Sequence, residues 1–213
     1  MSYLPSSSST KSATLSVTPK RIAIAANGFS LYENSIHKII LEYPSAWIKR
    51  ETLNNDNTTV TAFVAPDKIT LSAGDSSESI LQKIRETLYH QAATSVVLSV
   101  TRVSSSLRQV QYTLKDRVNS EIRLLGLSYG ENNVNVIESS DYKKLGSAIP
   151  ASKLVYTYLE TLGPRLNKKG MKIISLKGNK EIIITYSSGP DEFDRFLPVV
   201  DKMINTFTIT ESQ

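Results

Sequence analysis

A chain of 213 residues with 40% hydrophobic and 21% charged side chains is long enough for one sizeable globular domain and too short for two ordinary ones. It has no cysteine and only two histidines, His37 and His90, which excludes disulfides, thiolate nucleophiles and most metal sites built from Cys or His. The net charge is +5. Outside the N-terminal segment the Lys and Arg residues form no clustered basic stripe, so no nucleic-acid partner is expected.

The N-terminal segment differs from the rest in composition. Residues 1–21 are rich in Ser and Thr and carry almost no large apolar side chain, so they predict a disordered tail before a single domain at residues 22–210. A stalk and an organellar transit peptide are the alternatives for this tail. No window reaches the roughly 20 apolar residues of a membrane span, and no secretory signal is present, so we expect a cytoplasmic protein.

Regular structure is predicted from Phe29 onward. Period-two alternation predicts a strand at 39–43 that Pro44 ends, and short β-branched runs predict strands at 60–64 and 96–103. Between them, residues 74–94 show helical spacing and start signals. We expect a helix there, and the role of this helix at residues 75–93 is open.

A second helix is marked by its first residues. Thr113 and Asp116 have the spacing of a capping box, and apolar residues follow at helical intervals as far as Leu125. Gly126 and Gly130 suit its end.

Four strands then follow with no helix between them, at 134–139, 153–162, 171–176 and 181–186. Short connections require antiparallel pairing, and Gly178-Asn179 suits a tight hairpin between the last two strands. The longer connection 163–170 carries Arg165, Lys168 and Lys169, and we expect it to form a basic hairpin tip.

These strands are apolar on both faces, which requires cover on both sides. The sequence therefore predicts an α+β fold, a three-layer α/β/α sandwich around a mostly antiparallel sheet. The last helical stripe contains Pro198. We expect Pro190 to start a short turn and Pro198 to lie in the first turn of the main helix; one kinked helix is the alternative.

Four segments together resemble the PsbP-like family, named for the extrinsic subunit of photosystem II, and especially its archaeal members of unknown role. They are FSLYENSIHKIILEYPSAW, TLKDRVNSEIRLLG, MKIISLKGNKEIIITYS and FDRFLPVVDKMINTFTI, which lie within residues 29–209. The resemblance implies an α/β/α sandwich shared with Ran-binding nuclear import factors. The resemblance implies no metal-binding residue in this chain, because no motif of the sequence aligns with a metal-binding motif of the photosystem subunit.

Catalytic signatures are not found in the sequence. There is no nucleophile elbow, dinucleotide fingerprint or Walker A lysine, and the acids at 191, 192 and 194 are explained by the start of a helix rather than by a metal. We interpret His37 and His90 as surface or half-buried polar residues. No catalytic residue, metal or cofactor is predicted.

The leading hypothesis is therefore a non-catalytic binding or accessory module that docks on another protein or assembly. Candidate partner-facing residues are Trp47, Arg165, Lys168 and Lys169; Trp47 has packing of a turn as its other interpretation. The alternative function is a small-substrate hydrolase that uses His37 or His90, and a weaker one is a membrane-surface factor that uses the tail and the basic connection. The partner and the oligomeric state are left open.

The two chain ends offer a first test of these expectations. Removal of residues 1–20 should leave the melting temperature nearly unchanged, because this segment offers little apolar area to bury. Phe207→Ala should lower the free energy of unfolding by roughly 3–5 kcal/mol, if Phe207 closes the apolar stripe of the last helix. Thermal and denaturant unfolding of both variants checks this. A large loss on truncation, or a silent Phe207→Ala, would contradict the predicted domain boundary or the docking of the last helix.

Overall fold

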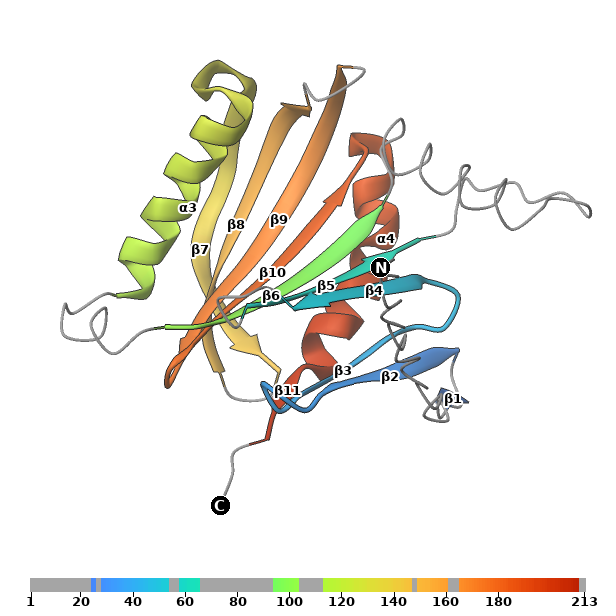
Figure 1. The fold of residues 1–213 in the computed structure, drawn as a ribbon. Helices are drawn as coiled ribbons and strands as arrows, with labels where there is room; N and C mark the ends of the chain where they lie inside the picture. Colours follow the sequence, from blue (N-terminus) through green and yellow to red (C-terminus); the bar gives the residue numbers. More distant parts are fainter. Residues whose placement is uncertain are drawn as a thin grey trace, which may run out of the picture.

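The computed structural model describes residues 24–25, 28–53, 58–65, 94–103, 113–146, 149–160 and 165–210. The predicted tail, His90 and nearly all of the predicted helix at 74–94 lie outside these residues. Within them, the strands form a four-stranded sheet and a seven-stranded sheet, and all neighbouring strands pair antiparallel (Figure 1).

The small sheet has the order β1-β2-β3-β11 and consists of β1 (Ile24–Ala25), β2 (Phe29–Asn34), β3 (Ile39–Pro44) and β11 (Thr208–Ile209). The large sheet has the order β4-β5-β6-β10-β9-β8-β7. Its strands are β4 (Ile48–Leu53), β5 (Thr59–Val64), β6 (Ser95–Arg102), β7 (Val134–Leu145), β8 (Ile149–Glu160), β9 (Leu166–Lys177) and β10 (Lys180–Ser188). The helices are α3 (Leu114–Tyr129), the short 3-10 helix η1 (Glu131–Asn133) and α4 (Pro190–Thr206).

All seven predicted strands are confirmed, as are their antiparallel pairing and the Gly178-Asn179 turn. Four of the described strands were not predicted: the two-residue strands β1 and β11, and the longer strands β2 and β4. In β4 nearly every residue is exposed, so the sequence has no alternation to reveal it. In β2 the buried positions include polar residues such as Ser30 and Asn34, which hide the pattern.

The large sheet buries both of its faces, as predicted. On β8, Leu154, Tyr156 and Tyr158 form one core cluster with Leu125 of α3. Their neighbour Val155 points to the opposite face and belongs to the main core beneath α4. The two helices thus lie on opposite sides of the sheet (Figure 1), and the α+β sandwich is confirmed.

The capping box of α3 is also confirmed. The Thr113 hydroxyl accepts a hydrogen bond from the Asp116 amide at 3.2 Å, and the Thr113 amide donates to the Asp116 carboxylate at 3.0 Å. The helix runs through Gly126 to Tyr129. Gly130, at φ 88°, ends it and donates its amide hydrogen to the Gly126 carbonyl.

The prediction for Pro198 is wrong, because α4 is one continuous helix with Pro190 in its first turn and Pro198 inside it. Proline removes the backbone bond to residue 194. Both Asp194 and Pro198 are exposed, so water can reach the carbonyl that loses its partner. The proline is tolerated because it lies on the solvent side of the helix.

The basic connection is shorter than predicted. Strand β9 begins at Leu166, so Lys168 and Lys169 lie within the strand and pair with Tyr158 and Thr157 instead of forming a hairpin tip. Gly170 follows in the same strand. A Cβ atom there would lie 2.6 Å from the ring of Tyr156, so the glycine makes room for the tyrosine across the ladder.

Gly146, the residue after β7, contacts the C-terminal end of α4. Its amide donates to the Ile204 carbonyl at 3.2 Å, and it adopts φ +59°. A Cβ atom would lie 1.9 Å from the carbonyl oxygen of Phe207, whose side chain is 1% exposed. The contact therefore fixes the end of α4 against β7.

Gly146 and Gly178 have nearly the same φ, +59° and +58°, but a Cβ atom at Gly178 would meet no heavy atom within 4 Å. Gly178→Ala should therefore cost only the conformational penalty, roughly 1–2 kcal/mol. Gly146→Ala adds a steric conflict with the backbone and should cost roughly 2–5 kcal/mol. Urea unfolding of both variants measures the difference. Equal losses would show that the close approach to Phe207 is not a constraint.

Candidate functional site

Four charged side chains meet between α3 and the large sheet. Arg117 donates to both carboxylate oxygens of Glu181, at 2.7 and 2.9 Å, and lies 2.6 Å from the Glu121 carboxylate. Lys172 on β9 binds the other oxygen of Glu121. We call these four residues the ionic cluster. It is neutral overall, and Arg117 and Glu121 are buried.

Burial and pairing oppose one another in the ionic cluster. Burial alone would lower the pKa of Arg117, but the carboxylates of Glu181 and Glu121 raise it. Burial alone would raise the pKa of Glu121, but Lys172 and Arg117 lower it. All charges are thus compensated, and the cluster holds α3 to β9 and β10 rather than offering a reactive group.

Three tyrosines continue the same face toward the end of α3. The rings of Tyr129 and Tyr158 lie 4.3 Å apart between centroids, and those of Tyr156 and Tyr158 lie 5.6 Å apart. Burial is the main cause that raises the pKa of each hydroxyl. They therefore stay protonated near neutral pH and act as packing and hydrogen-bonding groups, not as bases.

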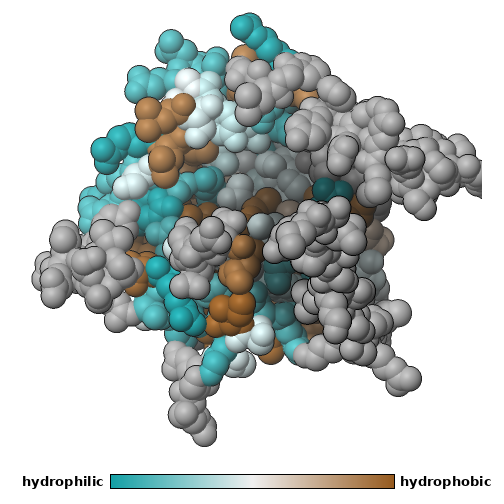
Figure 2. Space-filling model, viewed as in Figure 1, coloured by the Kyte–Doolittle hydropathy of each residue, from teal (hydrophilic) through white to brown (hydrophobic). Residues whose placement is uncertain are grey.

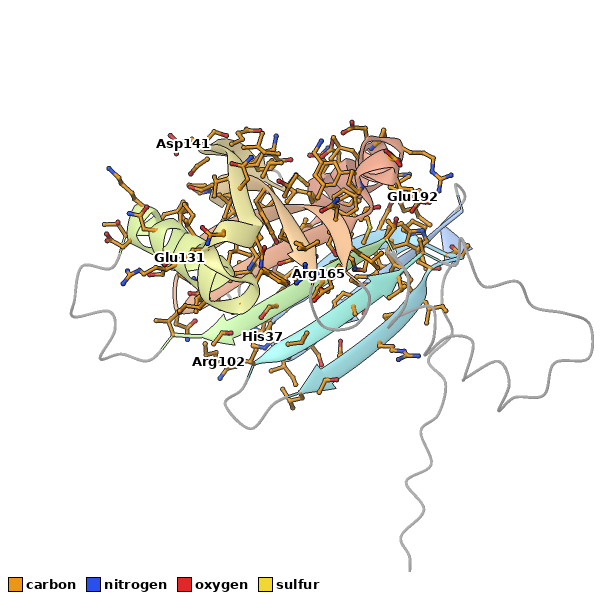
Figure 3. The ribbon with its side chains drawn as sticks, turned by 90° about the horizontal axis from the view of Figure 1, so that it is seen from above. His37, Arg102, Glu131, Asp141, Arg165 and Glu192 are labelled. Atoms are coloured by element: carbon orange, nitrogen blue, oxygen red, sulfur yellow. The ribbon has the colours of Figure 1, made fainter. Side chains whose placement is uncertain are left out.

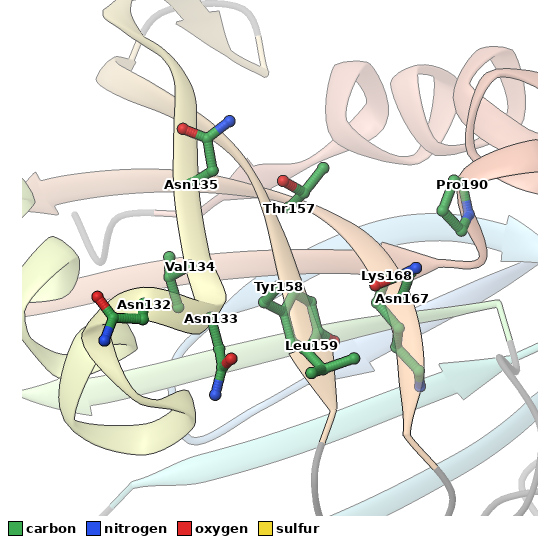
Figure 4. Close-up of a pocket in the computed structure, with 10 residues that line it drawn as sticks. All are labelled: Asn132, Asn133, Val134, Asn135, Thr157, Tyr158, Leu159, Asn167, Lys168 and Pro190. Atoms are coloured by element: carbon green, nitrogen blue, oxygen red, sulfur yellow. The ribbon is translucent and has the colours of Figure 1, made fainter.

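A hollow of about 550 Å³ lies beside these tyrosines, where β7 begins and β8 ends (Figure 4). Its lining is mostly polar and comes from Asn132, Asn133, Val134, Asn135, Thr157, Tyr158, Leu159, Asn167, Lys168 and Pro190. The side chains of Asn135, Thr157 and Asn167 point to one side of the strands, and those of Asn133 and Lys168 to the other (Figure 4). A small-molecule site needs polar groups that converge on one ligand, and here they diverge.

Besides Tyr158, the lining residue Lys168 also has a shifted pKa. Its side chain is half-buried, and this burial lowers the pKa of its amine, while Glu160 acts in the opposite direction. Arg165 is exposed at the start of β9 (Figure 3). Lys169 lies 3.2 Å from the Asp194 carboxylate and 4.4 Å from the centroid of the Phe193 ring, so it fastens α4 to β9.

Trp47 is buried. Its side chain is 7% exposed, and its ring meets that of Phe196 on α4 with centroids 6.1 Å apart. Trp47 is therefore part of the main core, and the interpretation as a packing residue describes it. Of the four candidate partner-facing residues, only Arg165 is exposed.

The prediction that His37 is a surface or half-buried residue is also wrong, because its side chain is fully buried. Its Nε2 atom lies 3.1 Å from the Thr59 hydroxyl, and its backbone amide donates to Asn34. Burial is the main cause that lowers the pKa of His37, and Lys180 and Arg102 add to it. His37 and Arg102 lie at the same edge of the molecule (Figure 3).

A polar network next to His37 joins the small sheet to the large one. Tyr32 on β2 donates to Glu51 on β4 and lies 2.8 Å from the Thr61 hydroxyl on β5. Burial and the Glu51 carboxylate raise the pKa of Tyr32 to about 12. The network links the two sheets, and the Tyr32 hydroxyl is protonated at neutral pH.

Asp191 and Glu192 lie in the first turn of α4, where carboxylates complement the helix dipole. Among the described residues, no group of three or more His, Cys, Asp or Glu side chains is placed to hold a metal ion. Nor does any helix in the described part of the chain have the length and apolar character to cross a membrane.

No protein-family model matches the sequence, and no curated protein matches it. The structure resembles that of cyanobacterial PsbP (CyanoP) from Synechocystis, with a TM-score of 0.57 and 11% identity over 90% of this chain and 98% of that chain. LpqN, involved in cell envelope biogenesis of Mycobacterium tuberculosis, gives a TM-score of 0.47 with 13% identity over 81% and 83% of the chains. A Pseudomonas aeruginosa protein of unknown function gives 0.46 with 16% identity over 88% and 100%.

The likeness to CyanoP shows that the fold is PsbP-like. It agrees with the resemblance that the four sequence segments suggest.

Glu121→Gln tests the ionic cluster. The change leaves Lys172 without its carboxylate and should lower the free energy of unfolding at pH 7 by about 3 kcal/mol. The wild-type pKa of Glu121 lies below its ordinary value of 4.5, so its contribution is complete above about pH 4.5 and is lost as the pH falls through the lowered pKa. The variant should therefore lose less stability than the wild type over that acid range.

Denaturant unfolding between pH 7 and pH 3 measures both effects. Asp141→Asn removes an exposed carboxylate on β7 and serves as the control, with an expected change within about 0.5 kcal/mol at pH 7. If both variants lose the same amount, the ionic cluster does not hold α3 to the sheet.

Proposed function

We propose that the protein is a non-catalytic binding or accessory module that docks on another protein or assembly. The observation that carries this proposal is the pairing of the charges in the ionic cluster; the Nδ1 atom of buried His37 has no hydrogen-bond partner among the described residues. The ionic cluster pairs all four of its charges, and His37 contacts Thr59 in a fully buried position. In the described part of the chain, these groups support the packing of the elements and face no converging pocket.

The PsbP-like fold supports the same proposal, because CyanoP shares this architecture. We further propose that the chain is a member of the PsbP-like family and resembles its archaeal branch, on the basis of the four sequence segments. The likeness to Ran-binding nuclear import factors and the cytoplasmic location stay predictions.

The hydrolase alternative requires a histidine within hydrogen-bond reach of a serine and a carboxylate. The side chain of His37 contacts the hydroxyl of a threonine, Thr59, so His37 does not favour this alternative. His90 lies outside the described residues, and the experiment below therefore includes it.

The test combines a binding assay and an activity assay. The purified protein is immobilised and exposed to native lysate, and retained proteins are quantified for the wild type, for Arg165→Glu and for Arg50→Glu. Both arginines are exposed, and Arg50 lies on the edge strand β4. We expect one partner in stoichiometric amount, weakened roughly tenfold by Arg165→Glu and unaffected by Arg50→Glu.

The activity assay uses ester and phosphoester substrates with the wild type and with His90→Ala. No turnover above the uncatalysed rate is expected from either protein. Saturable turnover that disappears in His90→Ala, together with no stoichiometric partner, would overturn the proposal in favour of the hydrolase.

A further inference from the structure

The surface formed by α3 and β7 exposes four large apolar side chains. On α3, Leu127 is 78% exposed and Leu124 is 47% exposed; on the neighbouring strand β7, Ile137 is 55% and Val136 37% exposed. Hydrophobic side chains gather over the upper part of α3 in Figure 2. We call these four residues the α3/β7 patch. Contiguous apolar surface of this kind marks interaction sites.

A groove of about 400 Å³ lies within the patch, between α3 and β7. Ile122, Gly126, Val134 and Val136 line it, and Arg123 and Glu131 stand beside them with opposite charges. Gly126 lies at the wall of the groove, and a Cβ atom there would make an ordinary van der Waals contact with the Glu131 side chain at 3.4 Å. The surface thus carries both a projecting Leu127 and a hollow next to it.

The two edges of the large sheet are treated differently. The outer strand β4 is exposed along Lys49, Arg50 and Glu51, and charged side chains on an edge strand discourage pairing with another molecule. The opposite edge, β7, has Ile137 as an extra residue in a bulge between Val136 and Glu138. The remainder of β7 carries charged residues such as Glu138 and Asp141, so the apolar exposure of this edge is confined to Val136 and Ile137 beside α3.

We propose that the α3/β7 patch binds a second copy of the same chain across a twofold axis beside Leu127. Arg123 and Glu131 have opposite charges, and each lies four residues from Leu127 along the sequence. A twofold axis at Leu127 reverses the direction of α3, so it sets Arg123 of each copy opposite Glu131 of the other. The two Leu127 side chains pack together over the grooves.

Self-complementarity is the reason to choose a second copy. A twofold interface uses the same patch on both molecules, so the patch must contain both members of each contact. Here Leu127 meets its own copy at the axis, and the groove beside it is lined by one cation, Arg123, and one anion, Glu131. A partner of single charge would match only one side of this rim.

Sedimentation velocity of the purified protein, at concentrations up to roughly 1 mM, measures the association. We expect a concentration-dependent dimer. Leu127→Lys should raise its dissociation constant at least about tenfold, because a charge would enter the centre of the interface. Leu53→Lys, at a leucine that is 54% exposed on β4, is the matched control and should leave the dimer unchanged.

Charge reversal gives the decisive test. Arg123→Glu and Glu131→Arg should each weaken the dimer, because each puts like charges opposite one another twice. An equimolar mixture of the two variants should restore it, since both contacts in the mixed pair then join opposite charges. Only a reciprocal contact of Arg123 with Glu131 predicts this rescue.

Circular dichroism and thermal melting of each variant show that the fold is kept. A monomer at every concentration overturns the proposal, as does a dimer that Leu127→Lys leaves intact or a mixture that shows no rescue. Because the assay uses the purified protein alone, these outcomes are independent of whether a different protein is captured from lysate.

Discussion

The fold depends on one constraint, which is that the inner strands of the large sheet are apolar on both faces. Leu154 and Tyr156 on one side of β8, and Val155 on the other, must all be removed from water. Each face therefore needs its own cover, and the chain supplies α3 for one and α4 for the other. The position of every other element follows from where these two helices must lie.

Helices α3 and α4 dock on the large sheet through different interactions. Helix α4 packs through apolar residues such as Val200 and Ile204 into a large continuous core, so burial alone accounts for its docking. Helix α3 covers a smaller apolar cluster and adds the ionic cluster around Arg117. Paired buried charges give little net stability, but they demand one geometry, and this fixes how α3 lies on the sheet. The ionic cluster thus sets the orientation of α3 on the large sheet.

Patterns along the chain could predict the capping box of α3, seven strands and the two-sided sheet, because these depend on local spacing. The ionic cluster could not be predicted in the same way. The i, i+4 spacing of Arg117 and Glu121 was a visible signal for one of its pairs, but Lys172 and Glu181 join it only through the register of β9 and β10. Burial of Trp47 and His37 likewise depends on contacts with elements distant in sequence, Phe196 in one case and Thr59 in the other.

The pairing of β11 with β3 has a consequence for how the chain is made. Thr206, just before β11, accepts a hydrogen bond from the backbone of Glu42, 164 residues earlier. The first strands of the small sheet therefore leave the ribosome long before their last neighbour exists. Contacts of such long range slow folding, because the chain loses much freedom before they form. The small sheet can be completed only once β11 has been synthesised, so β3 must keep its open edge from other chains until then.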